Sequence, residues 1–79
     1  MDNTTERVVK VLCRELRHPD VDERSSLGVT RRWDSLRHVQ VMMAVEREFG
    51  VRIPPASLPE LTTVEKIARF LQNPGVAAP

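Results

Sequence analysis

The residues with the clearest chemical potential lie together in Trp33-Asp34-Ser35-Leu36, between a long irregular segment and the strongest helical pattern of the chain. Asp34 is a good N-cap residue directly before a periodic apolar run, which places Ser35 in the first turn of a helix. The free N–H groups and the dipole of a helix start stabilise an exposed anion, such as a phosphodiester on the Ser35 hydroxyl, by about 0.3–1 kcal/mol. Asp-Ser is also common at helix starts that have no chemical role. Spacing alone therefore leaves both interpretations open.

Two other reactive side chains favour no catalytic or metal site. His38 follows Ser35 by three residues, but a lone histidine without an orienting acid lacks the third member that activation of a serine generally needs. Cys13 is the only cysteine, so it cannot form an internal disulfide, and no companion residues suggest a metal site around it. We expect Cys13 to be a small core residue. The sequence therefore predicts no metal site and no enzyme activity.

The elements that must position Ser35 begin with a helix from about Thr4 to Leu16. Asn3 and Glu6 form a capping signal before it, and apolar residues then recur at helical spacing. His18 precedes a proline, so we expect the helix to end before it and His18 to be exposed. Residues 17–32 then form a long connection, whose expected anchors in the core are Val21, Leu27 and Val29.

A second helix is expected over about Ser35 to Phe49, with Gly50 as its C-cap. Trp33 is expected to pack over its start as a staple-like contact. After it, one helical turn is expected over 56–58. A final helix is expected after Thr62-Thr63-Val64-Glu65, which we interpret as a capping box, and it should stop at Asn73-Pro74-Gly75. The predicted core consists of Leu12, Val45, Phe49, Val64 and Ile67.

The middle of the second helix carries more apolar side chains than one buried face needs. A domain of this size cannot bury Val39, Val41, Met42, Met43 and Val45 together. One interpretation is a central helix that is contacted on several sides. The other is a docking surface, for which methionine is well suited because its flexible thioether repacks against different partners.

Length and composition allow one small domain with a single modest core. Of the 79 residues, 41% are hydrophobic and 29% are charged, and the formal net charge is +1, so no strong field of one sign is expected. No apolar run reaches the roughly 20 residues of a membrane span. We expect a monomeric, cytoplasmic protein that binds neither membranes nor nucleic acid.

The run Trp-Asp-Ser-Leu-x-His, the apolar helix with a late glutamate, and Phe-Gly-Val-x-Ile together resemble the acyl carrier and peptidyl carrier superfamily. The resemblance covers about residues 4–72. It implies an all-α bundle of four helices, three long and one short, with a long loop between the first two. It also implies that Ser35 receives 4'-phosphopantetheine from coenzyme A, with Asp34 and Leu36 as the motif residues beside it.

The same resemblance implies a phosphopantetheinyl transferase as a partner, together with acyl-loading and acyl-consuming enzymes such as an acyltransferase or ketosynthase. The residues that we expect to meet these partners are Arg37, Val39, Gln40, Met42, Met43 and Arg47. The weakly basic charge, Arg31-Arg32 and Trp33 depart from the acidic, Gly-rich pattern of well-known members. Partners with acidic or apolar surfaces are therefore expected near Arg37 and Arg47.

Within that superfamily, the resemblance of Trp-Asp-Ser-Leu, without the Gly-Gly-x-Ser pattern of peptide-synthetase domains, favours a discrete acyl carrier over residues 1–79, with an ordered core at 4–72 and a tail at 73–79. A role in polyketide or other secondary-metabolite biosynthesis is expected. The nearest alternative is a discrete aminoacyl or peptidyl carrier. An alternative from another class is a small helical DNA-binding protein that uses Arg31, Arg32, Arg37 and His38.

Overall fold

The computed structural model describes residues 3–72. In chain order its elements are α1 (Asn3–Leu16), α2 (Ser35–Phe49), the 3-10 helix η1 (Pro55–Glu60) and α3 (Val64–Gln72). The expected all-α class is confirmed, with three longer helices and one short one. No strand is present within the described residues, which contain only one isolated bridge, between Ser26 and Thr63. The expected tail at 73–79 and the stop signal at 73–75 lie outside this range.

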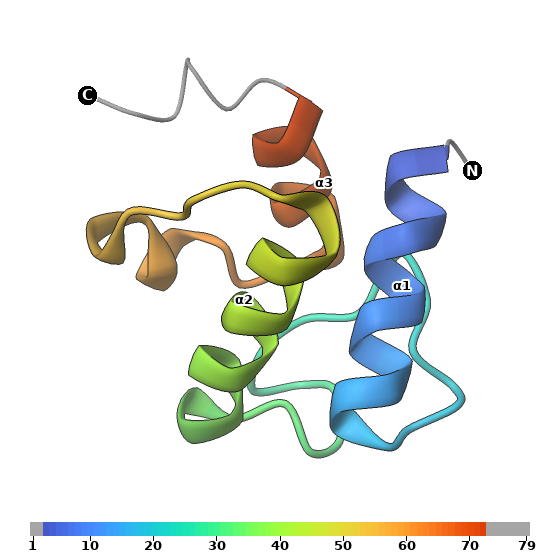
Figure 1. The fold of residues 1–79 in the computed structure, drawn as a ribbon. Coiled ribbons are helices and arrows are strands. Elements are labelled where there is room, and N and C mark those ends of the chain that lie inside the picture. Colours follow the sequence, from blue (N-terminus) through green and yellow to red (C-terminus); the bar gives the residue numbers. More distant parts are fainter. Residues whose placement is uncertain (1–2, 73–79) are drawn as a thin grey trace.

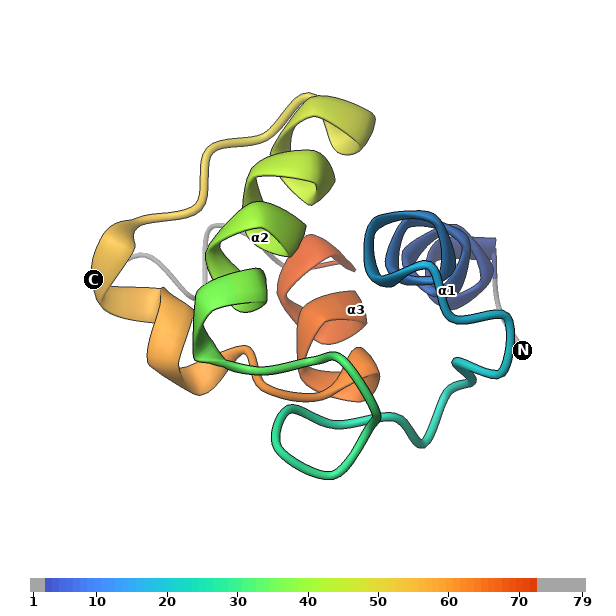
Figure 2. The ribbon, with the colours of Figure 1, turned by 90° about the horizontal axis from the view of Figure 1, so that it is seen from below.

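The three α-helices enclose one core, with α1 packed against both α2 and α3 (Figure 1). Figure 2 shows α1 nearly end-on, with α3 beside it and the 17–34 connection passing below the helices. Each helix contributes one apolar face, because its buried residues recur at intervals of three and four. The buried apolar residues are Val8, Val11, Leu12, Leu16, Val21, Trp33, Val41, Met42, Ala44, Val45, Ile53, Leu61, Val64, Ile67, Ala68 and Phe70.

Most of the predicted core is confirmed, since Leu12, Val45, Val64 and Ile67 are all fully buried. The prediction that Phe49 is a core residue is wrong. Phe49 is only half-buried and packs at the edge of the core. Its ring lies 4.2 Å beneath the guanidinium carbon of Arg7.

Two expectations about the region around the end of α1 were also wrong. Cys13 is half-buried at the edge of the core, where it was expected to be a core residue. His18, expected to be exposed, is half-buried and accepts a 3.4 Å hydrogen bond on Nδ1 from the Asp20 backbone N–H. The expected helix start at Thr4 and the observed start at Asn3 differ by one residue, which is within the usual uncertainty of helix ends.

The long connection is held to the start of α3 by backbone hydrogen bonds. The Leu27 N–H donates to Thr62 O at 2.8 Å, and the Val64 N–H donates to Ser25 O at 3.2 Å. Val21 is buried and Leu27 packs against the core, as expected, but Val29 is 85% exposed and anchors nothing. The apolar character of Val29 suggested burial, whereas the backbone bonds of its neighbours set the course of the loop.

The start of α3 differs from the expected capping box, in which Thr62 would be the N-cap and Glu65 the third helical residue. The Thr63 hydroxyl accepts from the Lys66 N–H at 3.0 Å, so Thr63 is the N-cap and the box has no glutamate at its third helical position. Upstream, η1 is longer than the expected single turn at 56–58 and includes Pro59. None of the helices described is long and apolar enough to cross a bilayer.

Candidate functional site

The start of α2 is a well-formed N-cap that presents Ser35. Asp34 has an extended backbone (φ −113°, ψ 179°), and its Oδ1 accepts the Arg37 N–H at 2.8 Å. The Arg37 guanidinium returns to Asp34 Oδ2 at 3.4 Å. Ser35 is thus the first residue of the helix, as predicted, and its side chain is exposed beside Leu36, which is 77% exposed. This geometry leaves room for a group attached to the Ser35 oxygen at the positive end of the helix.

Beneath this start, Trp33 and His38 form a buried aromatic pair. Trp33 is 1% exposed and His38 is 5% exposed, and their ring centroids are 5.9 Å apart. The Trp33 Nε1–H donates to His38 Nδ1 at 3.0 Å. Trp33 precedes the N-cap and His38 is the fourth helical residue, so the expected staple-like contact is confirmed, with an added hydrogen bond.

The other nitrogen of His38 is also engaged, because Nε2 lies 2.8 Å from Leu58 O in η1. Nδ1 accepts and Nε2 donates, so the neutral imidazole with its proton on Nε2 satisfies both neighbours. A Ser35–His38 pair is therefore ruled out by hydrogen bonding as well as by the lack of an orienting acid. Burial equally removes His38 from the surface that the DNA-binding alternative needs.

The docking residues expected on α2 are brought to one exposed surface, with one exception. Arg37, Gln40 and Arg47 are exposed, and Val39 and Met43 are 48% and 51% exposed. Met42 is the exception: it is 2% exposed and belongs to the core, although it also lines the groove described below. Because 3.6 residues make one turn, two adjacent methionines point in directions about 100° apart, and only one of them can face solvent here.

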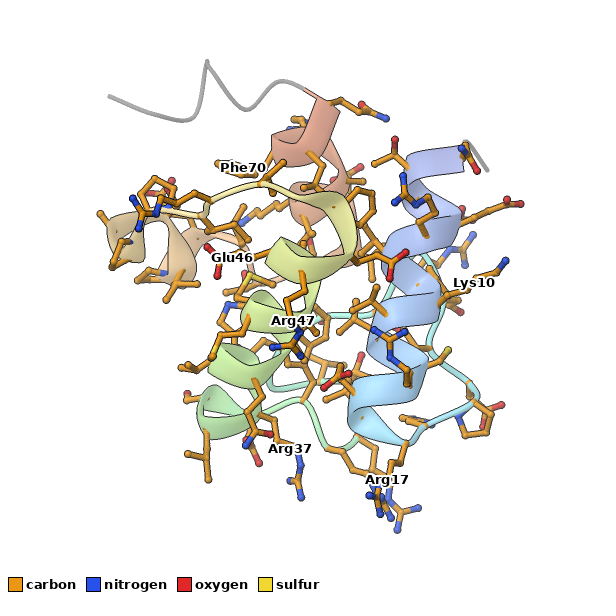
Figure 3. All side chains as sticks on the ribbon, in the orientation of Figure 1. Lys10, Arg17, Arg37, Glu46, Arg47 and Phe70 are labelled. Atoms are coloured by element: carbon orange, nitrogen blue, oxygen red, sulfur yellow. The ribbon has the colours of Figure 1, made fainter. Side chains whose placement is uncertain are left out.

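An apolar groove of about 530 Å³ lies beside this surface, between α2 and the segment that leads into η1. Val39 and Met43 form its outer rim on α2, and Leu58 lies on the opposite wall. Its complete lining is Val39, Met42, Met43, Glu46, Arg52, Ile53, Pro54, Pro55 and Leu58. The far end is held by Glu46, whose Oε2 accepts the Ile53 N–H at 2.7 Å (Figure 3).

On another side of the helix start, arginines gather around a polar pocket of about 450 Å³. Arg14, Arg17, Arg32 and Arg37 line it, with Glu15 as the one acid of the lining. Figure 3 shows Arg17 and Arg37 at the end of the molecule where α1 ends and α2 begins. Arg17 and Arg32 make no ion pair within residues 3–72, and both have left-handed backbones (φ 52° and 72°).

Two features of this region were missed by sequence reasoning. The first is the role of His38, although the spacing of Trp33 and His38 at the residue before the N-cap and the fourth helical residue was a usable signal. The second is the arginine pocket, which joins residues from three segments that are separate in the sequence and could not be placed together before the fold was known.

Comparison with known proteins agrees with this geometry. A family described as the phosphopantetheine attachment site matches residues 6–71 of the chain. An acyl carrier protein from Rickettsia bellii (strain RML369-C) is 36% identical to the chain, and the alignment covers 92% of this chain and 87% of the relative. The exposed, capped serine at the start of α2 fits a covalently attached phosphate ester. The chain therefore belongs to the acyl carrier protein superfamily, and its cofactor is a covalently attached 4'-phosphopantetheine.

Proposed function

We propose that Ser35 is the attachment residue and that this domain carries an acyl group as a thioester on its phosphopantetheine arm. The observation that carries the proposal is exposure: of the four serines, Ser35 alone is exposed, while Ser25 is buried and Ser26 and Ser57 are half-buried. Ser25 is also engaged, since its hydroxyl accepts the Asp22 N–H at 2.9 Å. Only Ser35 therefore offers a free approach for a modifying enzyme.

The residues around Ser35 define what the domain contributes to its own modification. The Ser35 oxygen attacks a phosphate of the coenzyme A pyrophosphate, forming the new ester bond as adenosine 3',5'-bisphosphate leaves. Nearby His38 cannot act as a base, because both of its ring nitrogens are engaged. The base and metal must come from a separate transferase. The domain supplies the nucleophile and stabilises the product phosphodiester at the α2 N-terminus. Once attached, the arm supplies a thiol that holds the cargo at high effective concentration.

Partner enzymes are proposed to dock on the exposed surface of α2. Leu36, Val39 and Met43 are three of the four exposed large apolar side chains of the described region, and they follow Ser35 along the helix. An apolar side chain of the partner would enter the groove at the rim formed by Val39 and Met43. Gln40 and the flanking Arg37 and Arg47 form the polar rim of this surface.

Charge favours partners that present carboxylates to this end of the molecule. Arg37 joins Arg14, Arg17 and Arg32 around the polar pocket, and Arg17 and Arg32 have no intramolecular acid to pair with in residues 3–72. Arginine pairs well with carboxylates because its planar fork donates two parallel hydrogen bonds. Enzymes that use basic surfaces to bind acidic carriers would meet like charge here.

In the cell, the domain is proposed to act as a discrete, cytoplasmic, non-catalytic carrier, with residues 1–79 as one unit. The Trp-Asp-Ser-Leu motif favours acyl cargo in polyketide or other secondary-metabolite biosynthesis. A discrete aminoacyl carrier would use the same serine and the same arm, and the identity of the thioester distinguishes the two. Its partners would then be an adenylating or condensing enzyme in place of an acyltransferase or ketosynthase.

Intact mass spectrometry tests the attachment residue. The purified apo protein is incubated with coenzyme A and a broad-specificity phosphopantetheinyl transferase, beside Ser35→Ala and the matched control Ser57→Ala. Wild type and Ser57→Ala should each gain one phosphopantetheine, and Ser35→Ala should gain none. A gain in Ser35→Ala would show that another residue is modified. The Ser35→Ala fold should be retained, because a surface substitution usually changes stability by no more than about 0.5 kcal/mol.

A further inference from the structure

Two polar side chains of α2 hold the opposite wall of the apolar groove by bonding to its backbone. His38 Nε2 donates to Leu58 O at 2.8 Å near the Ser35 end, and Glu46 Oε2 accepts the Ile53 N–H at 2.7 Å near the other end. Leu58 is also a groove-lining side chain. The position of that wall is therefore set in part by α2 itself.

The 3-10 helix that contains Leu58 has few other restraints. No residue of η1 is fully buried, and its N-terminal flank, Pro54, provides no side-chain cap. Its flanking residues Ile53 and Leu61 are buried, so the two ends of the segment are attached to the core, while within η1 itself only the half-buried Leu58 packs against the core. A segment with little buried apolar area is stabilised mainly by such individual hydrogen bonds.

The bond to Leu58 is oriented from the other side of the imidazole. Trp33 presents an indole N–H to His38 Nδ1, and an indole can only donate. Nδ1 must therefore be the acceptor, which leaves the proton on Nε2 and aimed at Leu58 O. In this way the fully buried Trp33, next to the Asp34 cap, fixes the tautomer that holds η1.

From these two hydrogen bonds of His38 we infer that His38 is a positioning residue for docking of the phosphopantetheinyl transferase: through Leu58 it sets the width of the groove whose other rim is Val39 and Met43. The inference rests on the proposed function, because it assumes that a partner uses this groove. With Leu58 held, the groove is in the shape that accepts an apolar side chain of the partner. Without that bond, η1 samples other positions, and a smaller fraction of the molecules has a groove that can accept the partner's side chain.

Two substitutions remove the two hydrogen bonds of His38 one at a time. The side-chain amide of asparagine extends about as far as the histidine Nδ1, and the side-chain amide of glutamine extends about as far as Nε2. His38→Asn keeps an acceptor for Trp33 and cannot reach Leu58 O. His38→Gln keeps a donor to Leu58 O and loses the acceptor for Trp33. His38→Asn loses the part-buried bond to Leu58 and His38→Gln loses the buried bond to Trp33, so a merely structural role would make His38→Gln at least as damaging as His38→Asn.

The experiment measures steady-state loading of Ser35 by a broad-specificity phosphopantetheinyl transferase, with carrier concentration varied. The KM for His38→Asn should rise about two- to tenfold, the factor expected from the loss of one hydrogen bond, while kcat stays within twofold. His38→Gln should keep a KM within twofold of wild type. Amide exchange of Leu61, which donates to Ser57 O and Leu58 O, should quicken in His38→Asn alone.

Equal KM values for the two variants would overturn the inference, as would a fall in kcat without a change in KM. Far-UV circular dichroism at the assay temperature verifies that both variants are folded. If one does not fold, the assay at a lower temperature and the Leu61 exchange rates of the other against wild type still decide the outcome. Failure of the proposed function has a different signature: wild type itself would gain no phosphopantetheine on Ser35.

Discussion

Replacing Trp33 by phenylalanine tests how much the buried start of α2 contributes to the fold. Trp33 is 1% exposed, so the smaller ring leaves a void and forfeits the burial of two ring carbons, at about 0.8 kcal/mol for each, besides the indole nitrogen. The His38 Nδ1 acceptor then loses its donor in a buried site, which costs about 1–3 kcal/mol more. We expect a total loss of about 3–5 kcal/mol.

That loss is large for this chain. A domain of 79 residues has a free energy of unfolding of about 4–12 kcal/mol, from roughly 0.05–0.15 kcal/mol per residue. Trp33→Phe should therefore be marginally stable or partly unfolded at 37 °C. Urea unfolding followed by circular dichroism at 222 nm measures the change, since the substitution removes the only tryptophan and with it the intrinsic fluorescence probe.

A double-mutant cycle separates the void from the hydrogen bond. Trp33→Phe, His38→Phe and the double variant are compared, because the double variant has neither the indole donor nor the ring acceptor. If the hydrogen bond contributes as stated, the double variant should be more stable than the sum of the single losses predicts, by about 0.5–3 kcal/mol. Additive losses, or a Trp33→Phe loss within about 0.5 kcal/mol, would refute the reasoning.

Three further substitutions test the core edge, the groove and the charge pattern. Phe49→Ala should cost about 2–3 kcal/mol in urea unfolding, below the 3–5 kcal/mol usual for a buried phenylalanine, because Phe49 is only half-buried; a loss above 4 kcal/mol would contradict that placement. Glu46→Ala should cost about 1–3 kcal/mol and quicken amide exchange at Ile53, while Glu46→Gln, which keeps an acceptor, should be milder. Arg37→Glu should lower use by the cognate acyl-loading enzyme and improve use by an enzyme with a basic carrier-binding surface, and unchanged rates with both would refute the charge argument.

The local signals in the sequence were enough to predict the helices and the place of Ser35 at the start of α2. Capping chemistry predicted the bounds of α2 correctly, because Asp34 and Gly50 act through their own backbone neighbours. Helical periodicity likewise predicted Leu12, Val64 and Ile67 as core. These features depend on residues within about four positions of one another, so a single sequence contains them.

The errors arose where the fold brings distant segments together. Val29 is as apolar as Val21 and Leu27 of the same loop, and only the packing of the loop determines that those two side chains reach the core while Val29 stays exposed. Phe49 was placed in the core because its size favours burial, whereas it lies at the edge of the α1–α2 contact beneath Arg7. His38 lacked an assigned role because its partner Leu58 is 20 residues away.

The backbone bonds that join Ser25 and Leu27 to Thr62 and Val64 have a consequence for how the protein opens. They bring together two points separated by about 37 residues, and closing a flexible loop of that length costs on the order of 3 kcal/mol of chain entropy. The loop closed by these bonds contains Ser35, the whole of α2 and η1. Its entropic cost is therefore offset only when α2 packs on α1. Opening this tie should therefore require cooperative loss of the bundle, and the Leu27 and Val64 amides should exchange with the slowest class of helical amides even though one of them belongs to a loop.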